Sequence, residues 1–587
     1  MCGIFTVIPK KNKKINLYKC ISSLNKLKRR GPDWSFHKVI NNVFFGQTVL
    51  SMTGNEKKNI SNHISRSQNF FLNYNGEIYN YKSLKKEFTK DIFSNNLSDT
   101  NILINLFDIK KYTEINKLLD GMYAYVVSDK KRKKIYISRD PQGEKSLFKF
   151  ENGENIIISS EIEPILNYTN YKDIDTDVLS TYFNSRHFIQ FEKTIYKDIK
   201  IIEPGDLIEI DLNKLTTRKI NNLSIRSYVS EKQFTRNLNR SEDDLLDELD
   251  HLIKKNLLEM IPEKRSFASV VSGGIDSSLV SSYLDEISDP KKFFSINHVN
   301  KDYISNKVYK FNKYFSKKIT SIRVHEKKYL ENLEISTKIC SGPINSHDFV
   351  GKLILAEETK KNNCKAIFGG DGADELFGGY ETYIQNIKNS KKNYSNYTKI
   401  LNHDFFDKNK EFKYFENKLK NNWNKSLESY DFVKNKVEKN RLAMMLIDSS
   451  VQLPSVGLRG SDLMSMYYSV ESRSLFLRKE IVKFSLNLPL KYKIDFSNKK
   501  KVLTKVLLKK LFVKKFEKKL LFRKQGFSGF PNEVGKYLGL YKNFKIHKYF
   551  GRLHYKSIKD ISSTFKWKIF NTEFFIKFYE KNILNFK

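Results

Sequence analysis

The chain has 587 residues, more than one hydrophobic core usually organises, so we expect two or three domains. It is 40% hydrophobic, yet it has no apolar run of about 18 residues and no charged leader before a long apolar stretch, which argues against a membrane span or a signal peptide and favours a cytoplasmic protein. The net charge of +39 comes from basic residues spread along the whole chain, so we interpret it as solvated surface rather than as a nucleic-acid-binding stripe.

The first chemically informative residue is Cys2. It becomes the first residue if Met1 is removed, which a small side chain at position two permits. A thiol then lies beside an α-amino group whose pKa is close to neutral, and that amine can serve as the base that activates the sulfur. The other three cysteines show no paired spacing, which argues against disulfides and a zinc site and fits a reducing compartment.

Five short polar motifs follow in the first 143 residues. They are residues 29–34 (RRGPDW), 75–80 (NGEIYN), 98–100 (SDT), 120–124 (DGMYA) and 138–143 (SRDPQG). Each alone is compatible with an ordinary turn. In this order, after Cys2, they resemble the glutaminase domain of class II glutamine amidotransferases, the N-terminal-nucleophile type. The resemblance covers about residues 2–210 and implies a four-layer αββα domain over residues 1–210.

This resemblance also implies the roles of individual residues. Cys2 would attack the side-chain amide of glutamine and form a thioester. Asn75 and the backbone N–H of Gly76 would form the oxyanion hole. Asp99 would pair with the α-amino group of glutamine, and Glu77 lies beside them in the glutamine-binding segment.

One departure concerns the glutamine α-carboxylate. The family usually has Arg-Leu-Ser-Ile where this chain reads VLSM at residues 49–52, and Val49 has no donor for a carboxylate. Three interpretations remain open. Another cation substitutes, with Arg30 and Arg66 as candidates; the glutamine site is weak and free ammonia partly serves; or the thioester chemistry accepts a different amide donor.

Residues 211–243 are polar and irregular, which predicts a linker, and apolar residues then recur at helical spacing up to residue 260.

The apolar run 268–271 leads into residues 272–278 (SGGIDSS) and a helix-like run. A strand, a glycine loop and a helix start form a cradle for phosphates, and Asp276 can hold magnesium against them. No lysine follows the glycines, so this is not the Walker pattern. It resembles the pyrophosphate loop of enzymes that split ATP into AMP and pyrophosphate.

A second strong motif spans residues 366–380 (AIFGGDGADELFGGY), where a strand ends in a glycine-rich turn with three carboxylates. Such carboxylates repel each other unless a cation sits between them. The motif closely resembles the signature of the asparagine synthetase family. With the apolar run 293–296, the alternation of strands and helices predicts a doubly wound parallel sheet with ligands at the carboxyl ends of its strands.

The whole chain therefore resembles the glutamine-hydrolysing asparagine synthetase family, with a synthetase domain over residues 244–540 and a helical, unassigned tail over residues 541–587. By position, Asp276 and Asp374 would hold magnesium, Asp371 would lie near the acyl-adenylate, and Lys501 would neutralise charge during adenylation. Residues 523–527 would lie near ATP. The residues that the resemblance assigns to ATP are Val271, Ser272, Gly273, Gly274, Asp276, Ser277, Ser278, Ile296, Gly369 and Gly370.

Three further segments depart from the family pattern. Leu463 replaces an arginine in residues 462–473, residues 474–478 (SLFLR) replace Val-Pro-Phe-Leu-Asp, and residues 341–344 (SGPI) replace Asp-Glu-Pro-Phe. These changes of charge either alter the pocket for the acceptor or only repack it, and the sequence leaves both open.

The expected function is ATP-dependent amidation of a carboxylate, by default aspartate to asparagine, with ammonia from glutamine and with magnesium. The alternative acceptor is another carboxylate, such as a uronic acid of a surface sugar. The expected partners are glutamine, ATP and a small carboxylate. We expect no binding to nucleic acid or to membranes, and the sequence leaves open whether the protein forms a homodimer. Two other functions are possible hypotheses. An RNA-modifying enzyme built on the same nucleotide-binding fold would leave Cys2 without a role. Val49 and Leu463 prompt the other hypothesis, a degenerate relative that binds but does not catalyse.

Overall fold

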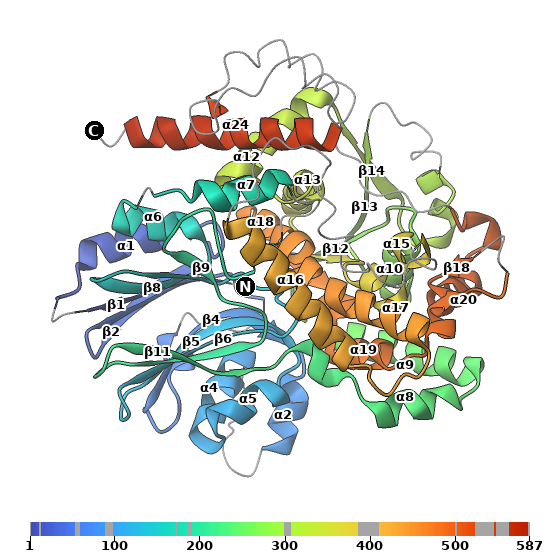
Figure 1. Ribbon diagram of the computed structural model, residues 1–587, viewed down its shortest axis with the longest axis horizontal. Helices are drawn as coiled ribbons and strands as arrows, with labels where there is room; N and C mark the ends of the chain where they lie inside the picture. Colours follow the sequence, from blue (N-terminus) through green and yellow to red (C-terminus); the bar gives the residue numbers. More distant parts are fainter. Residues whose placement is uncertain are drawn as a thin grey trace.

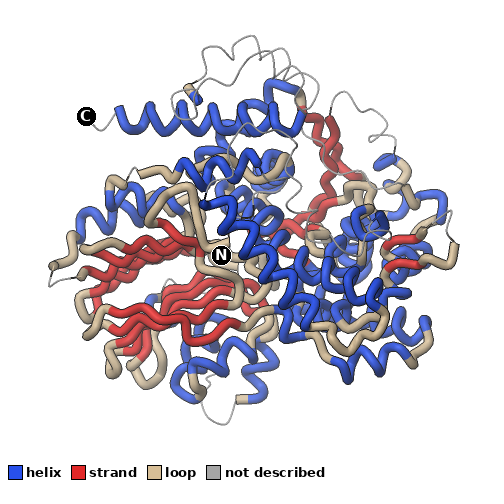
Figure 2. The backbone as a smooth tube through the Cα atoms, in the orientation of Figure 1, coloured by secondary structure: helices blue, strands red, loops and turns tan. Residues whose placement is uncertain are grey.

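The structure, a computed structural model, describes residues 2–10, 13–52, 59–88, 98–171, 173–184, 189, 191–298, 307–385, 410–498, 502–522, 545–546 and 563–584. Two stacked sheets form one part of the molecule, and a helix-rich part with a third sheet lies beside it (Figure 1). The N-terminus lies near the middle, between the two parts (Figure 2). In the described ranges, every helix is too short or too polar to cross a membrane.

The first domain contains two antiparallel sheets. The first has the order β2 (Trp34–Ile40), β3 (Val43–Val49), β1 (Cys2–Pro9), β8 (Asn155–Ser159), β7 (Phe148–Glu151) and β9 (Ile199–Ile201). The second has the order β11 (Thr216–Asn222), β10 (Asp206–Asp211), β6 (Lys134–Arg139), β5 (Gly121–Asp129) and β4 (Phe70–Ile78).

These sheets are covered on both outer faces. Successive side chains of a strand point to opposite faces, so Ile4 of β1 lies in the apolar layer between the sheets, whereas Phe5 packs under helices. The first sheet packs against α1 (Leu17–Asn25), α6 (Ile162–Thr169) and α7 (Thr176–Asn184). The second packs against α2 (Tyr81–Glu87), α4 (Asp99–Ile109) and α5 (Tyr112–Leu118). The predicted αββα arrangement is confirmed.

The second domain is built on a parallel sheet. Its order is β14 (Ile319–Val324), β13 (Lys292–His298), β12 (Phe267–Val270), β15 (Ala366–Gly369) and β16 (Glu471–Ser474). The chain runs outward from β12 to β14 and then returns to the other side of β12. The order therefore reverses between β12 and β15, and in such sheets ligands bind at the carboxyl ends on either side of this point. The predicted doubly wound sheet is confirmed.

Helices cover both faces of this sheet. Phe267 of β12 packs with α9 (Glu242–Met260) and α10 (Ile275–Ile287) on one face. Ala268 packs with α12 (Glu326–Cys340), α13 (Asp348–Lys361) and α18 (Arg459–Tyr467) on the other. The remaining helices and strands are η1 (Ile60–His63), η2 (Ile225–Tyr228), α8 (Glu231–Leu238), η3 (Asn312–Tyr314), α14 (Ala373–Phe377), α15 (Thr382–Gln385), α16 (Lys410–Glu428), α17 (Lys436–Ile447), the π-helical η5 (Asp448–Leu458), η6 (Leu475–Leu477), α19 (Lys479–Leu486), η7 (Leu490–Tyr492), β17 (Ile494–Asp495), β18 (Leu503–Thr504), α20 (Val506–Lys515), η8 (Lys518–Leu520) and α24 (Ser563–Leu584).

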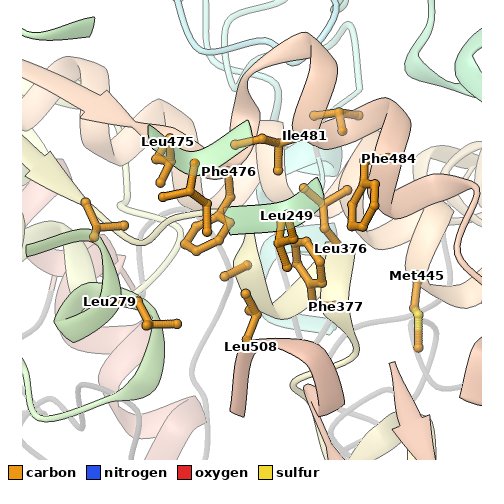
Figure 3. Close-up of a cluster of buried hydrophobic side chains, with 14 of the residues drawn as sticks. Leu249, Leu279, Leu376, Phe377, Met445, Leu475, Phe476, Ile481, Phe484 and Leu508 are labelled. Atoms are coloured by element: carbon orange, nitrogen blue, oxygen red, sulfur yellow. The ribbon is translucent and has the colours of Figure 1, made fainter. Parts of the chain in front are cut away.

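The short helix α14 is anchored in the largest apolar cluster. Leu376 and Phe377 lie among side chains from several surrounding helices (Figure 3). The ring of Phe377 meets that of Phe476 edge-on, with centroids 5.9 Å apart. Because α14 directly follows the acidic turn after β15, this packing fixes the position of that turn.

Residues 211–243 differ from the irregular linker expected for them. They contain β11, η2 and α8, and β11 extends the second sheet of the first domain. β11 is the edge strand of that sheet, and none of its seven residues is fully buried. Its sequence (TTRKINN) therefore lacks the apolar alternation by which a strand is normally found.

Helix α24, from the predicted tail, packs against both domains. Phe565 lies in the apolar cluster of the first domain, and Trp567 lies in that of the second. Asn571 Nδ2 donates to the hydroxyl of Tyr182 at 2.7 Å and to the carbonyl of Ile344 at 2.8 Å. One side chain of this helix thus connects α7 with the segment that follows α12.

We expect Lys493→Met to raise the melting temperature at pH 7. Lys493 is fully buried, and its ammonium has no hydrogen-bond partner among the described residues. Burial lowers the pKa of Lys493 from 10.5 to about 7. Between pH 7 and pH 10.5 the unfolded chain therefore binds more protons than the folded one, so the stability of the wild type rises with pH. The advantage of the methionine variant should therefore shrink by about 2 kcal/mol between pH 7 and pH 9. Calorimetry of both proteins at the two pH values tests this; an advantage that is equal at both contradicts it.

Candidate functional site

The first strand brings Cys2 against β4. Cys2 is 7% exposed, and its backbone N–H donates to Asn75 Oδ1 at 3.1 Å. β1 and β4 belong to different sheets, so this contact crosses between them. The other atom of the same amide group, Asn75 Nδ2, is buried and has no hydrogen-bond partner among the described residues. Asn75 therefore carries an unused N–H donor in the amide group that contacts Cys2.

The two residues after Asn75 also have specific environments. A Cβ on Gly76 would lie 2.3 Å from the carbonyl oxygen of Met122, so only glycine allows β4 and β5 to approach this closely here. Burial raises the pKa of Glu77 to about 8, although Arg473 acts to lower it. Arg473 Nη2 lies 3.4 Å from the Glu77 carboxylate and comes from β16 of the second domain. The second domain thus contributes a charge beside Glu77 of the first domain.

Asp99 lies at the first turn of α4 and contacts β4. Its Oδ2 accepts from the hydroxyl of Tyr74 at 2.8 Å and from the backbone N–H of Ile78 at 3.1 Å. Its Oδ1 accepts from the backbone N–H of Thr100 at 2.8 Å. Burial raises the pKa of Asp99 despite these donors, so a cation placed against it would be favoured. The predicted glutamine-binding residues are therefore brought together around β4.

The cation expected to replace the missing arginine is not Arg30. Val49 pairs with Cys2 across β3 and β1 and is buried. Arg30 is fully buried, and each of its three guanidinium nitrogens already donates to a protein acceptor. Arg66 is an exposed residue after η1. A third candidate, missed in the sequence, is Arg265 before β12, whose Nε donates to the carbonyl of Ser51 at 3.2 Å.

The glycine loop after β12 has a closed shape. Gly273 adopts a φ of +76°, which favours glycine. Ser272 and Ser277 are bonded to each other through their hydroxyls at 2.8 Å, which joins the loop to the first turn of α10. Asp276 lies in that first turn, and the Ser278 hydroxyl is buried with no partner in the described part of the chain. The loop therefore presents a helix start, as a phosphate site requires.

The two predicted loops meet at the point where the strand order reverses. A Cβ on Gly370, after β15, would lie 2.7 Å from the Cβ of Asp276 and 3.0 Å from the backbone nitrogen of Ser277. A Cβ on Gly369 would meet nothing within 4 Å, so open space lies in front of that residue. The phosphate-type loop and the acidic turn thus form one site, as the sequence predicted.

A buried lysine that the sequence analysis did not assign joins these loops. Lys505 Nζ lies 2.5 Å from Asp276 and 2.6 Å from Asp374. Burial acts against its charge, but the two carboxylates outweigh that effect and raise its pKa. The predicted Lys501 lies outside the described residues. Lys505 directly precedes α20, in a left-handed conformation with a φ of +51°.

Asp371 belongs to the same turn but faces other partners. Its carboxylate accepts from the hydroxyl of Ser461 at 2.8 Å and lies 3.4 Å from Lys352 Nζ. Lys352 also lies 3.3 Å from Asp348. These residues, apart from Ser461, line a cavity of about 490 Å³ that also includes Gly370 and Asp374. The cavity therefore adjoins the loops and carries charges of both signs.

The other nucleotide and metal assignments can be placed as well. The side chain of Val271 is fully buried, so only its backbone is available to a ligand, whereas Ile296 is half-buried on β13. Within the described residues, His, Cys, Asp and Glu side chains form no group of three or more suited to a metal. Asp276 and Asp374 do converge on one cation, the ammonium of Lys505. Two carboxylates beside a phosphate loop fit magnesium, which usually takes one or two protein carboxylates together with phosphate oxygens.

Arg30 connects the two domains at this point. Its Nε donates to the carbonyl of Cys2 at 3.1 Å, and its Nη atoms donate to Glu161 at 3.2 Å and Asp462 at 2.8 Å. Asp462, on α18, also receives the backbone N–H of Ser146 at 3.2 Å. Burial alone would raise the pKa of Asp462, but Arg30 and Lys145 hold it below its ordinary range. The positive charge of Arg30 in the first domain is thus partly balanced by the carboxylate of Asp462 in the second domain.

The departures from the family pattern have local explanations. Leu463 is buried in the apolar cluster of α13 and α18, and the neighbouring Asp462 takes its cations from the first domain instead. Arg478 lies 3.0 Å from Asp120 and 2.9 Å from Glu259. These two changes therefore serve packing between the elements, and neither residue lines the cavity beside Asp371.

Comparison with known families assigns both parts of the chain. Residues 1–221 match the family model described as glutamine amidotransferase domain. Residues 248–538 match the model described as asparagine synthase.

Individual relatives agree with these matches. The chain is 25% identical to a probable glutamine-hydrolysing asparagine synthetase of Acanthamoeba polyphaga mimivirus, over 70% of this chain and 73% of that protein. It is 27% identical to asparagine synthetase 1 of Bacillus subtilis (strain 168), over 60% of this chain and 54% of that one, and 23% identical to asparagine synthetase 3 of the same organism, over 86% and 84%. The chain thus matches little more than half the length of some relatives. A solved glutamine phosphoribosylpyrophosphate amidotransferase of B. subtilis has a TM-score of 0.29 and 12% identity, covering 55% of this chain and 81% of that one.

We expect Arg30→Met to destabilise the protein by about 3 kcal/mol, because it leaves Asp462 and Glu161 buried with fewer cations. The double variant Arg30→Met/Asp462→Leu should recover part of that loss. Thermal melting of the three proteins tests this, with Lys13→Met, which breaks the exposed pair with Glu154, as a control expected to change little. A double variant no more stable than the single one contradicts the role of Arg30 as the partner of Asp462.

Proposed function

This chain belongs to the glutamine-hydrolysing asparagine synthetase family, and we propose that it transfers the amide nitrogen of glutamine to a carboxylate that ATP has activated. The observation that carries the proposal is the continuous contact between the two predicted sites. Arg30 joins the carbonyl of Cys2 to Asp462, and the adjacent Ser461 donates to Asp371. The pocket that would release ammonia and the cavity that would consume it are thus held together by one short series of bonds.

At the first site, the thiolate of Cys2 attacks the side-chain amide carbon of glutamine. The carbon–nitrogen bond breaks, ammonia leaves with a proton from the α-amino group of Cys2, and water later cleaves the thioester to glutamate. Asn75 Nδ2, the donor without a partner in the described residues, stabilises the oxyanion together with the Gly76 N–H. Asp99, whose buried carboxylate favours a cation, holds the substrate ammonium.

At the second site, a carboxylate oxygen of the acceptor attacks the α-phosphorus of ATP and pyrophosphate leaves. Ammonia then attacks the acyl carbon, the bond to AMP breaks, and the nitrogen loses one proton. Ser272, Ser277 and the start of α10 bind the phosphates. Magnesium held by Asp276 and Asp374 would supply charge neutralisation on the phosphate oxygens. Lys505 contacts both carboxylates and adds a cation beside them.

Aspartate is the acceptor that the cavity favours. Lys352 offers a cation and Asp371 a carboxylate in the same space of about 490 Å³. An α-amino acid has both an ammonium and a carboxylate to meet these charges, whereas a uronic acid has no ammonium. A sugar carboxylate remains the alternative acceptor.

The function is tested by separating its two half-reactions. We expect Cys2→Ala to abolish product formation with glutamine and to leave the rate with ammonia nearly unchanged, because the thiol acts only at the first site. Cys20→Ala is the matched control, since burial raises the pKa of that thiol to about 12 and leaves it inert. Mass spectrometry of reactions with ATP, magnesium and a panel of carboxylic acids identifies the product. Equal activity of the Cys2 and Cys20 variants with glutamine, or no product with any acid, contradicts the proposal.

We further expect Arg265→Gln to raise the KM for glutamine about tenfold or more, because Arg265 is a guanidinium that reaches Ser51, two residues after Val49. The KM for ammonia should stay unchanged, since ammonia has no carboxylate to bind. Lys264→Gln, at the adjacent exposed position, is the control. A KM for glutamine that stays the same in Arg265→Gln, or rises equally in Lys264→Gln, excludes Arg265 as the substitute.

A further inference from the structure

A cavity of about 410 Å³ lies between the two domains, and it shares no lining residue with the cavity beside Asp371. Its walls come from the end of β6, from η2, from α16, from η5 and from the start of α18. Six of its lining residues are basic: Arg139, Lys219, Arg226, Lys418, Lys425 and Arg459. Among the described lining residues the only acidic one is Glu203, which lies 3.1 Å from Lys219. Lys219 also lies 2.9 Å from Asp206, and Lys418 lies 3.1 Å from Glu192. The excess of positive charge in the lining therefore comes mainly from the other four basic residues.

The partners of Arg139 and Arg226 do not remove this excess. Arg139 donates to the backbone carbonyls of Gly143 at 2.7 Å and Ile202 at 2.8 Å, and also to that of Lys145. Arg226 donates to Asn422 Oδ1 at 2.9 Å and to the hydroxyls of Ser224 and Ser426 at 3.4 Å each. All of these acceptors are neutral. Burial lowers the pKa of Arg226 to about 10, as expected for a cation without a close carboxylate.

Two buried hydroxyls of the lining also lack partners. The Oγ atoms of Ser146 and Ser450 are buried and have no hydrogen-bond partner among the described residues. Buried polar groups are nearly always hydrogen-bonded, so such atoms call for a ligand or water. Cations and hydroxyl donors around one space are the groups that bind oxyanions.

We propose that this interdomain cavity binds a small oxyanion with at least two negative charges, a phosphate ester or a polycarboxylate, through Arg226, Lys425 and the hydroxyl of Ser450. Its volume is within the range of small-molecule sites, which is about 300–1,000 Å³. Glutamine has no net charge and aspartate has one negative charge, so neither matches a lining with six basic residues.

The position of the cavity relates it to the second active site. Ser450, Val451 and Pro454 of η5 line it, whereas Gln452 and Leu453 of the same segment line the cavity beside Asp371. The π-helical segment η5 is thus a wall common to both cavities. An oxyanion bound between the domains would lie one backbone segment away from the acceptor.

Calorimetric titration of the full chain tests the proposal. Tripolyphosphate and citrate are titrated separately in magnesium-free buffer that contains no other multivalent anion, so that neither anion binds through magnesium and nothing competes for the site. We expect saturable binding of one anion per chain, weakened about tenfold or more by Arg226→Gln and about threefold by Lys425→Gln. Lys425 is exposed, so that variant should fold even if Arg226→Gln does not. Lys420→Gln, an exposed position on α16 outside the lining, should bind like the wild type.

The outcomes separate the specific site from general attraction to a basic protein. Loss of affinity in the Arg226 and Lys425 variants but not in the Lys420 variant supports the site. Binding of both anions then points to charge as the determinant, and binding of tripolyphosphate alone points to a phosphate ester. No saturable binding of either anion, or equal affinities in all the folded variants, overturns the proposal.

Discussion

The buried guanidinium of Arg30 is the interaction on which both predicted sites depend. It holds the carbonyl of Cys2 from one side and is balanced by Glu161 and Asp462 on the other. Separating these charges inside the protein is costly, because a buried ion without its partner keeps the full penalty of leaving water. The two domains therefore have a strong reason to dock in one arrangement. That arrangement places α18, which carries Asp462, within reach of the acidic turn through Ser461.

The electrostatics of the interface differ from those of the surface. Most of the +39 net charge is dispersed, but several carboxylates at the interface pair with a particular cation. In the contacts of Arg473 with Glu77 and of Arg478 with Asp120, the first domain supplies the acid and the second supplies the arginine. Arg30 with Asp462 has the opposite polarity. Such alternation fixes orientation, because sliding the domains would bring like charges together.

The sequence was sufficient for both folds and for the residues carried by contiguous motifs. Cys2 and Asn75 were expected together because their segments match one family in order, and the loops at 272–278 and 369–375 were expected together because parallel strands end at one edge. Lys505 was missed because lysines surround it, and only the long-range packing of α20 shows which of them reaches Asp276. The candidate cation Arg265 was missed because it reaches the first domain only when the two domains are docked. β11 was missed because an edge strand needs no apolar alternation.

Helix α24 has a consequence for the order in which the protein is assembled during translation. Asn571 bonds to Ile344, 227 residues earlier in the chain, and also to Tyr182. At roughly 5–20 residues per second, a ribosome needs about 10–45 s to make the intervening length. Until then the apolar seam that receives Phe565 and Trp567 is uncovered in the nascent polypeptide. During that interval the nascent chain exposes an apolar surface of the kind that chaperones bind. If the ribosome stalls before α24 is made, the product lacks the helix that packs against both domains.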